Sequence, residues 1–141
     1  MGNEKRNRMG TQPHLEVSNL QFAIGGNPVL CGVNFQIDQG EIACLLGPSG
    51  CGKTSVLRLI GGFITPDIGT VVVQGRQISS PTQVVAPEKR HISMVFQDYA
   101  LFPHMTVSEN IRFGLQKLSK SARQEKCQSL LSLTRLEHLS E

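Results

Sequence analysis

The chain has 141 residues, of which 39% are hydrophobic, and it carries a formal net charge of +3 at pH 7. This length fits one domain around a single core, and no apolar run approaches the ~20 residues that a membrane-spanning helix needs. The positive excess lies largely in the polar beginning of the chain, where Lys5, Arg6 and Arg8 outnumber Glu4. The remainder is nearly neutral, so it offers no basic stripe for nucleic acid.

Residues 1–11 contain no apolar run, so the beginning of the chain lacks the pattern of a secretory signal. We expect residues 1–12 to form a disordered tail and residues 13–141 to form the folded domain. The chain has 4 cysteines, and no two of them form a C-x-x-C pair. This spacing argues against a zinc site or a disulfide framework and favours a reduced, cytosolic protein.

The first predicted elements form an antiparallel sheet. In residues 14–24 apolar and polar side chains alternate, and the parity of the alternation changes near Asn19, which indicates a bulge or a bend. Gly25–Pro28 has the composition of a turn between strands. Val33–Ile37 alternates again and predicts a further strand of the same sheet.

A strand, a loop and a helix are predicted next. Glu41–Leu46 is a short and nearly continuous apolar run, which is typical of a strand buried on both faces of a parallel sheet, and it places Cys44 in the core. Apolar side chains in residues 56–60 recur at helical spacing. Gly61 and Gly62 follow directly and can end that helix.

The second half of the chain predicts further strands before it turns helical. Thr70–Gly75 is rich in valine and predicts a strand, residues 79–88 contain two prolines and predict a loop, and His91–Gln97 predicts another buried strand. Thr106 and Glu109 have the spacing of a capping box, so a helix is expected to begin there.

A longer helix is predicted over about residues 119–136. Its leucines are expected to lie mostly in the core. They are Leu130, Leu131, Leu133 and Leu136.

The loop between the predicted strand and the first helix reads GPSGCGKTS, residues 47–55. This is the G-x-x-x-x-G-K-T spacing of a P-loop, which holds nucleotide phosphates at a helix N-terminus. Lys53 is placed to reach the β- and γ-phosphates, the Thr54 hydroxyl to reach Mg²⁺, and Ser55 to lie beside the α-phosphate. The residues expected to bind nucleotide here are Gly47, Pro48, Ser49, Gly50, Cys51, Gly52, Lys53, Thr54 and Ser55.

The order of these signals over about residues 14–139 resembles the ATP-binding subunit of an ABC transporter. Within that family the chain is similar to importer ATPases for ferric iron, with those for polyamines and sulfate close behind. The resemblance implies an α/β P-loop NTPase fold, with an antiparallel β subdomain followed by the start of a parallel-sheet core with helices. It also implies ATP and Mg²⁺ as ligands, and a location on the cytoplasmic face of a bacterial inner membrane.

The segment HISMVFQDYALFPHMTVSENIRFGL resembles the family's Q-loop region. On this resemblance Gln97 is the Q-loop glutamine, which reaches Mg²⁺ and the water near the γ-phosphate, and Gln97 and Lys53 are the catalytic residues. The same resemblance assigns Asp98–Val107, and Tyr99–Val107 within it, to the contact with a transmembrane permease subunit. For adenine the family uses an aromatic side chain, and here either Phe22 or Ile24 is expected to pack against the base.

Several of the family's motifs are absent from these 141 residues. The signature LSGGQ, the Walker B aspartate, the catalytic glutamate and the switch histidine are expected beyond them, so residues 13–141 form an incomplete ATPase domain. Two interpretations stay open: part of a subunit that dimerises and hydrolyses ATP, or a fragment that binds nucleotide without turnover. A GTPase is less well matched, because no N-K-x-D motif occurs, and a nucleoside kinase would not contain the Q-loop segment.

Overall fold

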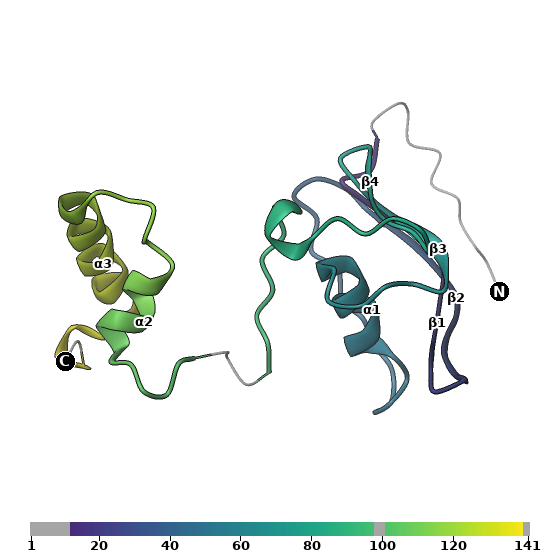
Figure 1. Cartoon of the computed structure of the whole chain (residues 1–141), viewed down its shortest axis with the longest axis horizontal. Helices are drawn as coiled ribbons and strands as arrows, with labels where there is room; N and C mark the ends of the chain where they lie inside the picture. Colours follow the sequence, from purple (N-terminus) through teal and green to yellow (C-terminus); the bar gives the residue numbers. More distant parts are fainter. Residues whose placement is uncertain (1–11, 98–100, 140–141) are drawn as a thin grey trace. The chain divides into compact units, whose positions relative to one another are not determined.

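The computed structural model describes residues 12–97 and 101–139. The chain divides into two compact units, Met1–Met94 and Val95–Glu141, and each is described by itself (Figure 1). The expected disordered tail lies outside the described residues except for Gln12. The elements in chain order are β1 (Leu15–Ile24), β2 (Asn27–Ile37), α1 (Lys53–Gly61), β3 (Ile68–Val73), β4 (Arg76–Ser79), the 3-10 turn η1 (Pro87–Lys89), α2 (Val107–Phe113), α3 (Lys120–Thr134) and the 3-10 turn η2 (Glu137–Leu139).

The first unit contains an antiparallel sheet with the strand order β2-β1-β3-β4. The predicted bulge is confirmed, because the register of β1 shifts between Val17 and Leu20 and Asn19 adopts a φ of 47°. The predicted turn is confirmed for Gly25 and Gly26, whose φ values of 56° and 82° are those a two-residue hairpin turn requires. Asn27 and Pro28, which were assigned to the same turn, already belong to β2.

Strand β4 was not predicted. Val73 pairs directly with Arg76, so Gln74 and Gly75 form a two-residue turn with φ values of 50° and 75°. A Gln-Gly pair is a weaker turn signal than Asn-Gly, which explains why the sequence pattern did not indicate this hairpin. Beyond β4 the predicted loop is largely confirmed, with one isolated bridge from Ser79 to Val84 and the short turn η1.

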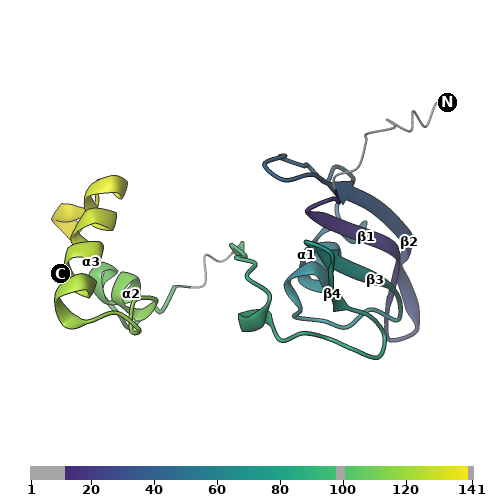
Figure 2. The same cartoon turned by 90° about the horizontal axis from the view of Figure 1, so that it is seen from above.

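The core of the first unit lies between the sheet and helix α1 (Figure 2). Val56, Leu59 and Ile60 are buried on one side of the helix, as the helical spacing predicted. They pack with buried residues of the sheet, among them Leu20 and Val71, which have no exposed surface. This burial fixes the face of α1 that meets the sheet.

Two predicted buried strands are not formed. Glu41–Leu46 and His91–Gln97 have no regular secondary structure apart from turns at the ends of the second segment. Ile42 is 97% exposed and Val95 is 84% exposed, and Cys44 is exposed instead of lying in the core. Among the described residues all strand pairs are antiparallel, so neither segment has a parallel neighbour to accept its backbone hydrogen bonds.

The second unit is helical. Helix α2 begins after Thr106, whose side chain accepts a hydrogen bond from the Glu109 amide while Glu109 bonds back to the Thr106 amide, so the predicted capping box is confirmed. Helix α3 begins after Ser119 and packs on α2 through the buried residues Ser108 and Cys127, whose side chains lie 3.6 Å apart.

The leucines of the α3 region differ in burial. Leu131 is buried, and Leu130 and Leu136 are half-buried. Leu133 is 80% exposed, so its assignment to the core was wrong. Helices α2 and α3 contact each other along a single face of α3, and Leu133 does not lie on that face.

Candidate phosphate-binding site

The predicted P-loop forms the N-terminus of helix α1. The helix begins at Lys53 after Gly52, no side chain caps it, and its first turn contains no acidic residue. Val56 donates the first helical hydrogen bond, to the Gly52 carbonyl at 3.0 Å. The amides of Lys53, Thr54 and Ser55 therefore have no intrahelical acceptor, and they lie at the positive end of the helix dipole, which favours an anion.

Gly52 meets two constraints at the start of this helix. Its φ of 91° lies in the left-handed region. A Cβ atom at this position would lie 2.6 Å from Cδ2 of Leu30 and 3.1 Å from the carbonyl oxygen of Val29. Strand β2 thus packs directly against the loop, and only glycine allows the backbone to pass there.

The side chain of Lys53 folds back over its own loop. Its Nζ atom donates to the carbonyl oxygens of Gly47 at 2.8 Å and Pro48 at 2.7 Å, and it lies 3.5 Å from Sγ of Cys51. These acceptors are neutral, so an anion entering the loop would offer Lys53 stronger partners. A cation and unpaired helix amides that converge on one exposed loop fit the phosphate groups of a nucleotide.

The hydroxyl groups predicted for this site lie beside Lys53. Thr54 is exposed and Ser55 is half-buried, both in the first turn of α1. The Thr54 side chain is accessible to a hydrated Mg²⁺ ion, which prefers one or two protein oxygens together with phosphate oxygens. The residues present therefore fit Mg²⁺ as a companion of a bound phosphate.

The two candidates for the adenine contact differ in their surroundings. Phe22 packs against the core of the first unit, whereas Ile24 is 60% exposed at the end of β1. The register of β1 shifts between Phe22 and Ala23, so strict alternation does not relate the faces of Phe22 and Ile24 across this step. Of the two, Ile24 has the surface available for a base.

Gln97 belongs to the second unit and is exposed. Its expected role beside Mg²⁺ stays a prediction. In the segment expected to contact a permease, Asp98, Tyr99 and Ala100 lie outside the described residues.

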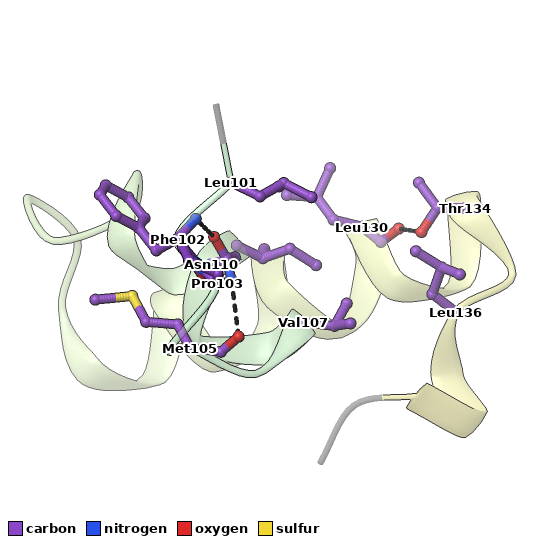
Figure 3. Close-up of a pocket in the computed structure, with 10 residues that line it drawn as sticks. Leu101, Phe102, Pro103, Met105, Val107, Asn110, Leu130, Thr134 and Leu136 are labelled. Carbon is purple, nitrogen blue, oxygen red and sulfur yellow. Dashed lines mark hydrogen bonds between the residues drawn. The ribbon is translucent and has the colours of Figure 1, made fainter. Parts of the chain in front are cut away.

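The described remainder of that segment forms an apolar groove with helices α2 and α3, which we call the α2–α3 groove (Figure 3). Its volume is about 460 Å³. Residues that line it include Leu101, Phe102, Met105, Val107, Leu130 and Leu136.

The side chain of Asn110 forms hydrogen bonds with the backbone at the rim of the α2–α3 groove (Figure 3). Its Oδ1 atom accepts a hydrogen bond from the Phe102 amide at 2.9 Å. Its Nδ2 atom donates to the carbonyl oxygens of Phe102 at 3.1 Å, Met105 at 3.1 Å and Thr106 at 3.0 Å. The sequence interpretation did not name Asn110, although an amide side chain one turn after a helix N-cap is a recognisable signal.

Among the described residues, no helix has both the length and the apolar character needed to span a membrane.

Residues 30–141 match the family model described as ABC transporter. The chain is 43% identical over 128 residues to the spermidine/putrescine import ATP-binding protein PotA of Photobacterium profundum. This match covers 89% of this chain and 33% of that protein. It is 39% identical over 137 residues to the protein of the same name from Haemophilus influenzae. That match covers 96% of this chain and 36% of the relative. The chain thus spans about a third of the length of these curated relatives.

A solved structure supports the same relationship. The structure of cbiO1 from Clostridium perfringens, part of the ABC transporter complex cbiONQ, matches with a TM-score of 0.75 and 27% sequence identity. The match covers 93% of this chain and 54% of that chain.

Proposed function

The chain belongs to the ABC transporter family, and from that premise we propose that residues 47–55 bind the phosphates of ATP in the ATP-binding subunit of an importer. The observation that carries this proposal is the position of Lys53, which holds an ammonium group over an exposed glycine loop at the uncapped start of α1. A helix N-terminus and a cation attract the same anionic ligand.

Each residue of the site has a proposed part in binding. Lys53 exchanges the carbonyl groups of Gly47 and Pro48 for oxygens of the β- and γ-phosphates, which pair its charge with an anion. The amides of the first turn of α1 donate to the same phosphates. Thr54 offers its hydroxyl to Mg²⁺, which when bound neutralises charge on the phosphate oxygens. Ile24 gives the base an apolar surface.

We propose ATP hydrolysis only for a protein with the full length of the relatives described above. In that protein Lys53 and Gln97 would stabilise and orient the reacting groups, and two ATP-binding subunits would form a homodimer around the nucleotide, as the family resemblance implies. The subunit would lie on the cytoplasmic face of the bacterial inner membrane. Transport of the substrate by the assembled importer would use ATP binding and hydrolysis as its source of free energy.

The transported substrate is proposed to be a polyamine. Both relatives described above are named for spermidine and putrescine import. The expectation of ferric iron receives no support from these names. The names of these relatives carry this proposal.

The α2–α3 groove is the proposed contact with the permease. Its lining is almost entirely apolar, and Leu101 at its edge is 67% exposed. An amphipathic helix can place its apolar side chains in such a groove, as in other helix-in-groove complexes. The segment Tyr99–Val107, which was assigned to this contact from the sequence, supplies one wall through its described residues.

The nucleotide proposal is tested by titrating the 141-residue chain with MgATP in a calorimeter. Lys53→Ala should weaken binding roughly 10- to 150-fold, because a charge-assisted contact contributes about 1.5–3 kcal/mol. Lys126→Ala is the matched control, since Lys126 is an exposed lysine on α3. Equal affinities of Lys53→Ala and the unchanged chain would contradict the proposal. Competition by inorganic pyrophosphate should show that the phosphates, rather than the base, provide most of the affinity.

A further inference from the structure

Arg90 is a buried cation in the first unit, with 3% of its surface exposed. Its Nε atom donates to the Val85 carbonyl at 2.7 Å, and its Nη2 atom donates to Oγ of Ser79 at 2.8 Å. Its Nη1 atom donates to the carbonyl oxygens of Leu59 at 3.1 Å and Ile60 at 2.8 Å. Each guanidinium nitrogen is therefore hydrogen-bonded, and every one of these acceptors is neutral.

These contacts join three segments that are separate in the sequence. Leu59 and Ile60 lie in the last turn of α1, Ser79 ends β4, and Val85 lies in the loop before η1. The Leu59 carbonyl also accepts a hydrogen bond from the Gly62 amide at 3.2 Å. The carbonyl groups at a helix C-terminus lie at the negative end of the dipole, so a cation there is stabilising. The guanidinium group supplies donors in a rigid planar fork that can bridge several segments at once.

The chain also makes room for this group. Gly62, which follows α1, has a φ of 83°, and a Cβ atom at this position would collide with the Arg90 guanidinium. Desolvation by the surrounding protein lowers the pKa of Arg90 from its ordinary value, and an arginine stays charged even so. The end of α1 is thus packed closely around a cation.

The opposite end of the same helix carries the phosphate-binding groups. Helix α1 has 9 residues, and Lys53 and Thr54 form its first turn. Because an α-helix is a stiff element, a group that fixes its last turn also fixes the direction in which its first-turn amides face. The apolar face of α1 resists lifting from the sheet, whereas the directional hydrogen bonds of Arg90 resist sliding and rotation of the helix.

We propose that Arg90 is a positioning residue for the phosphate-binding loop and acts through helix α1. This inference rests on the proposed function of residues 47–55 and extends it to a buried residue outside that loop. Its prediction is that weakening the fork at Arg90 lowers nucleotide affinity even in molecules that remain folded.

The test compares Arg90→Lys with Arg58→Lys in the 141-residue chain. Arg58 is the matched control because it lies on the same helix with an exposed side chain. A lysine at position 90 keeps the charge but carries its donors on one nitrogen, so it does not reproduce the planar set of guanidinium contacts. We expect Arg90→Lys to raise the Kd for MgATP about tenfold at a temperature where circular dichroism shows a folded chain, as the loss of one or two hydrogen bonds predicts. Arg58→Lys should leave this Kd unchanged.

A second readout uses no nucleotide. Hydrogen exchange followed by mass spectrometry should show that Arg90→Lys accelerates exchange in α1 relative to the β1–β2 hairpin, and that Arg58→Lys does not. Ser79→Ala removes a single acceptor of the fork, so it should change both readouts in the same direction by a smaller amount. This variant keeps the proposal testable if Arg90→Lys does not fold.

The outcomes separate the two proposals. If the unchanged chain binds no MgATP, the proposed function fails, while the exchange of α1 still shows whether Arg90 holds the helix. If Arg90→Lys and Ser79→Ala lower the melting temperature but change neither the Kd nor the relative exchange of α1, Arg90 has a general structural role and the inference is overturned. Faster exchange in α1 with an unchanged Kd would also overturn the link to the phosphate-binding loop.

Discussion

The ammonium nitrogen of Lys53 lies 2.7 Å from the carbonyl oxygen of Pro48 within the same loop. The same nitrogen also donates to the carbonyl oxygen of Gly47 at 2.8 Å, so the Lys53 side chain crosses its own loop. This arrangement holds the loop closed around its own cation. If the loop binds nucleotide as proposed, the phosphates would replace contacts that already exist, so the loop would require little reordering.

Gly52→Ala should destabilise the chain more than a substitution that introduces backbone strain alone. Both Gly52 and Gly25 have positive φ values, but a Cβ atom at Gly52 meets Leu30 and Val29, whereas a Cβ atom at Gly25 meets nothing within 4 Å. The added overpacking costs about 1–3 kcal/mol. Urea unfolding of Gly52→Ala and Gly25→Ala measures this difference. Equal free energies of unfolding would contradict the packing of β2 against the loop.

Cys51 should report on nucleotide binding. It is exposed within the phosphate-binding loop, and its Sγ atom lies 3.5 Å from Nζ of Lys53. We expect iodoacetamide to modify Cys51 and MgATP to slow that reaction, because phosphates would cover the loop. Cys31 is the internal control, since it is exposed on β2. Peptide mass spectrometry gives both rates in one sample. Slowing of both cysteines alike would indicate a general effect of MgATP rather than binding at the loop.

Asn110 should determine whether the rim of the α2–α3 groove keeps its shape. Asn110→Ala removes the acceptor of the Phe102 amide and the donor to three carbonyl groups, and should cost about 1–3 kcal/mol. Asn110→Asp keeps the acceptor of the Phe102 amide, loses the donor and places a carboxylate beside three carbonyl oxygens. The exchange of the Phe102 amide should therefore be fast in Asn110→Ala and slow in Asn110→Asp. Slow exchange in both variants would show that other contacts hold the rim.

The 141-residue chain should release no phosphate from MgATP above the level of Lys53→Ala. The family's LSGGQ signature, Walker B aspartate and catalytic glutamate are not among these 141 residues. Phosphoryl transfer depends on positioning and charge stabilisation from several groups together, so a phosphate-binding loop without them binds and does not turn over. A malachite green assay on the purified chain provides the measurement. Turnover clearly above Lys53→Ala would mean that other residues supply the missing groups.

Local features of the sequence were sufficient for several elements. The Thr106–Glu109 capping box, the Gly25–Gly26 turn and the bulge at Asn19 each depend on residues close together in the chain, and the structure confirms all three. The same holds for the start of α1, where the Gly52–Lys53 step defines the helix N-terminus. In each case the backbone conformation follows from short-range hydrogen bonds and from φ values that glycine adopts readily.

Features that need distant partners were decided by the tertiary structure. Glu41–Leu46 has the composition of a buried strand, yet no described strand pairs with it, because a strand satisfies its N–H and C=O groups only through a neighbour. Conversely, no local pattern indicated that Arg90 would bond to Leu59 and Ile60, some thirty residues earlier in the chain. The loop of residues 47–55 at the start of α1 could be predicted from the sequence, because its geometry is local. Only the fold determined what holds its helix in place, because a buried cation takes its acceptors from whichever segments pack around it.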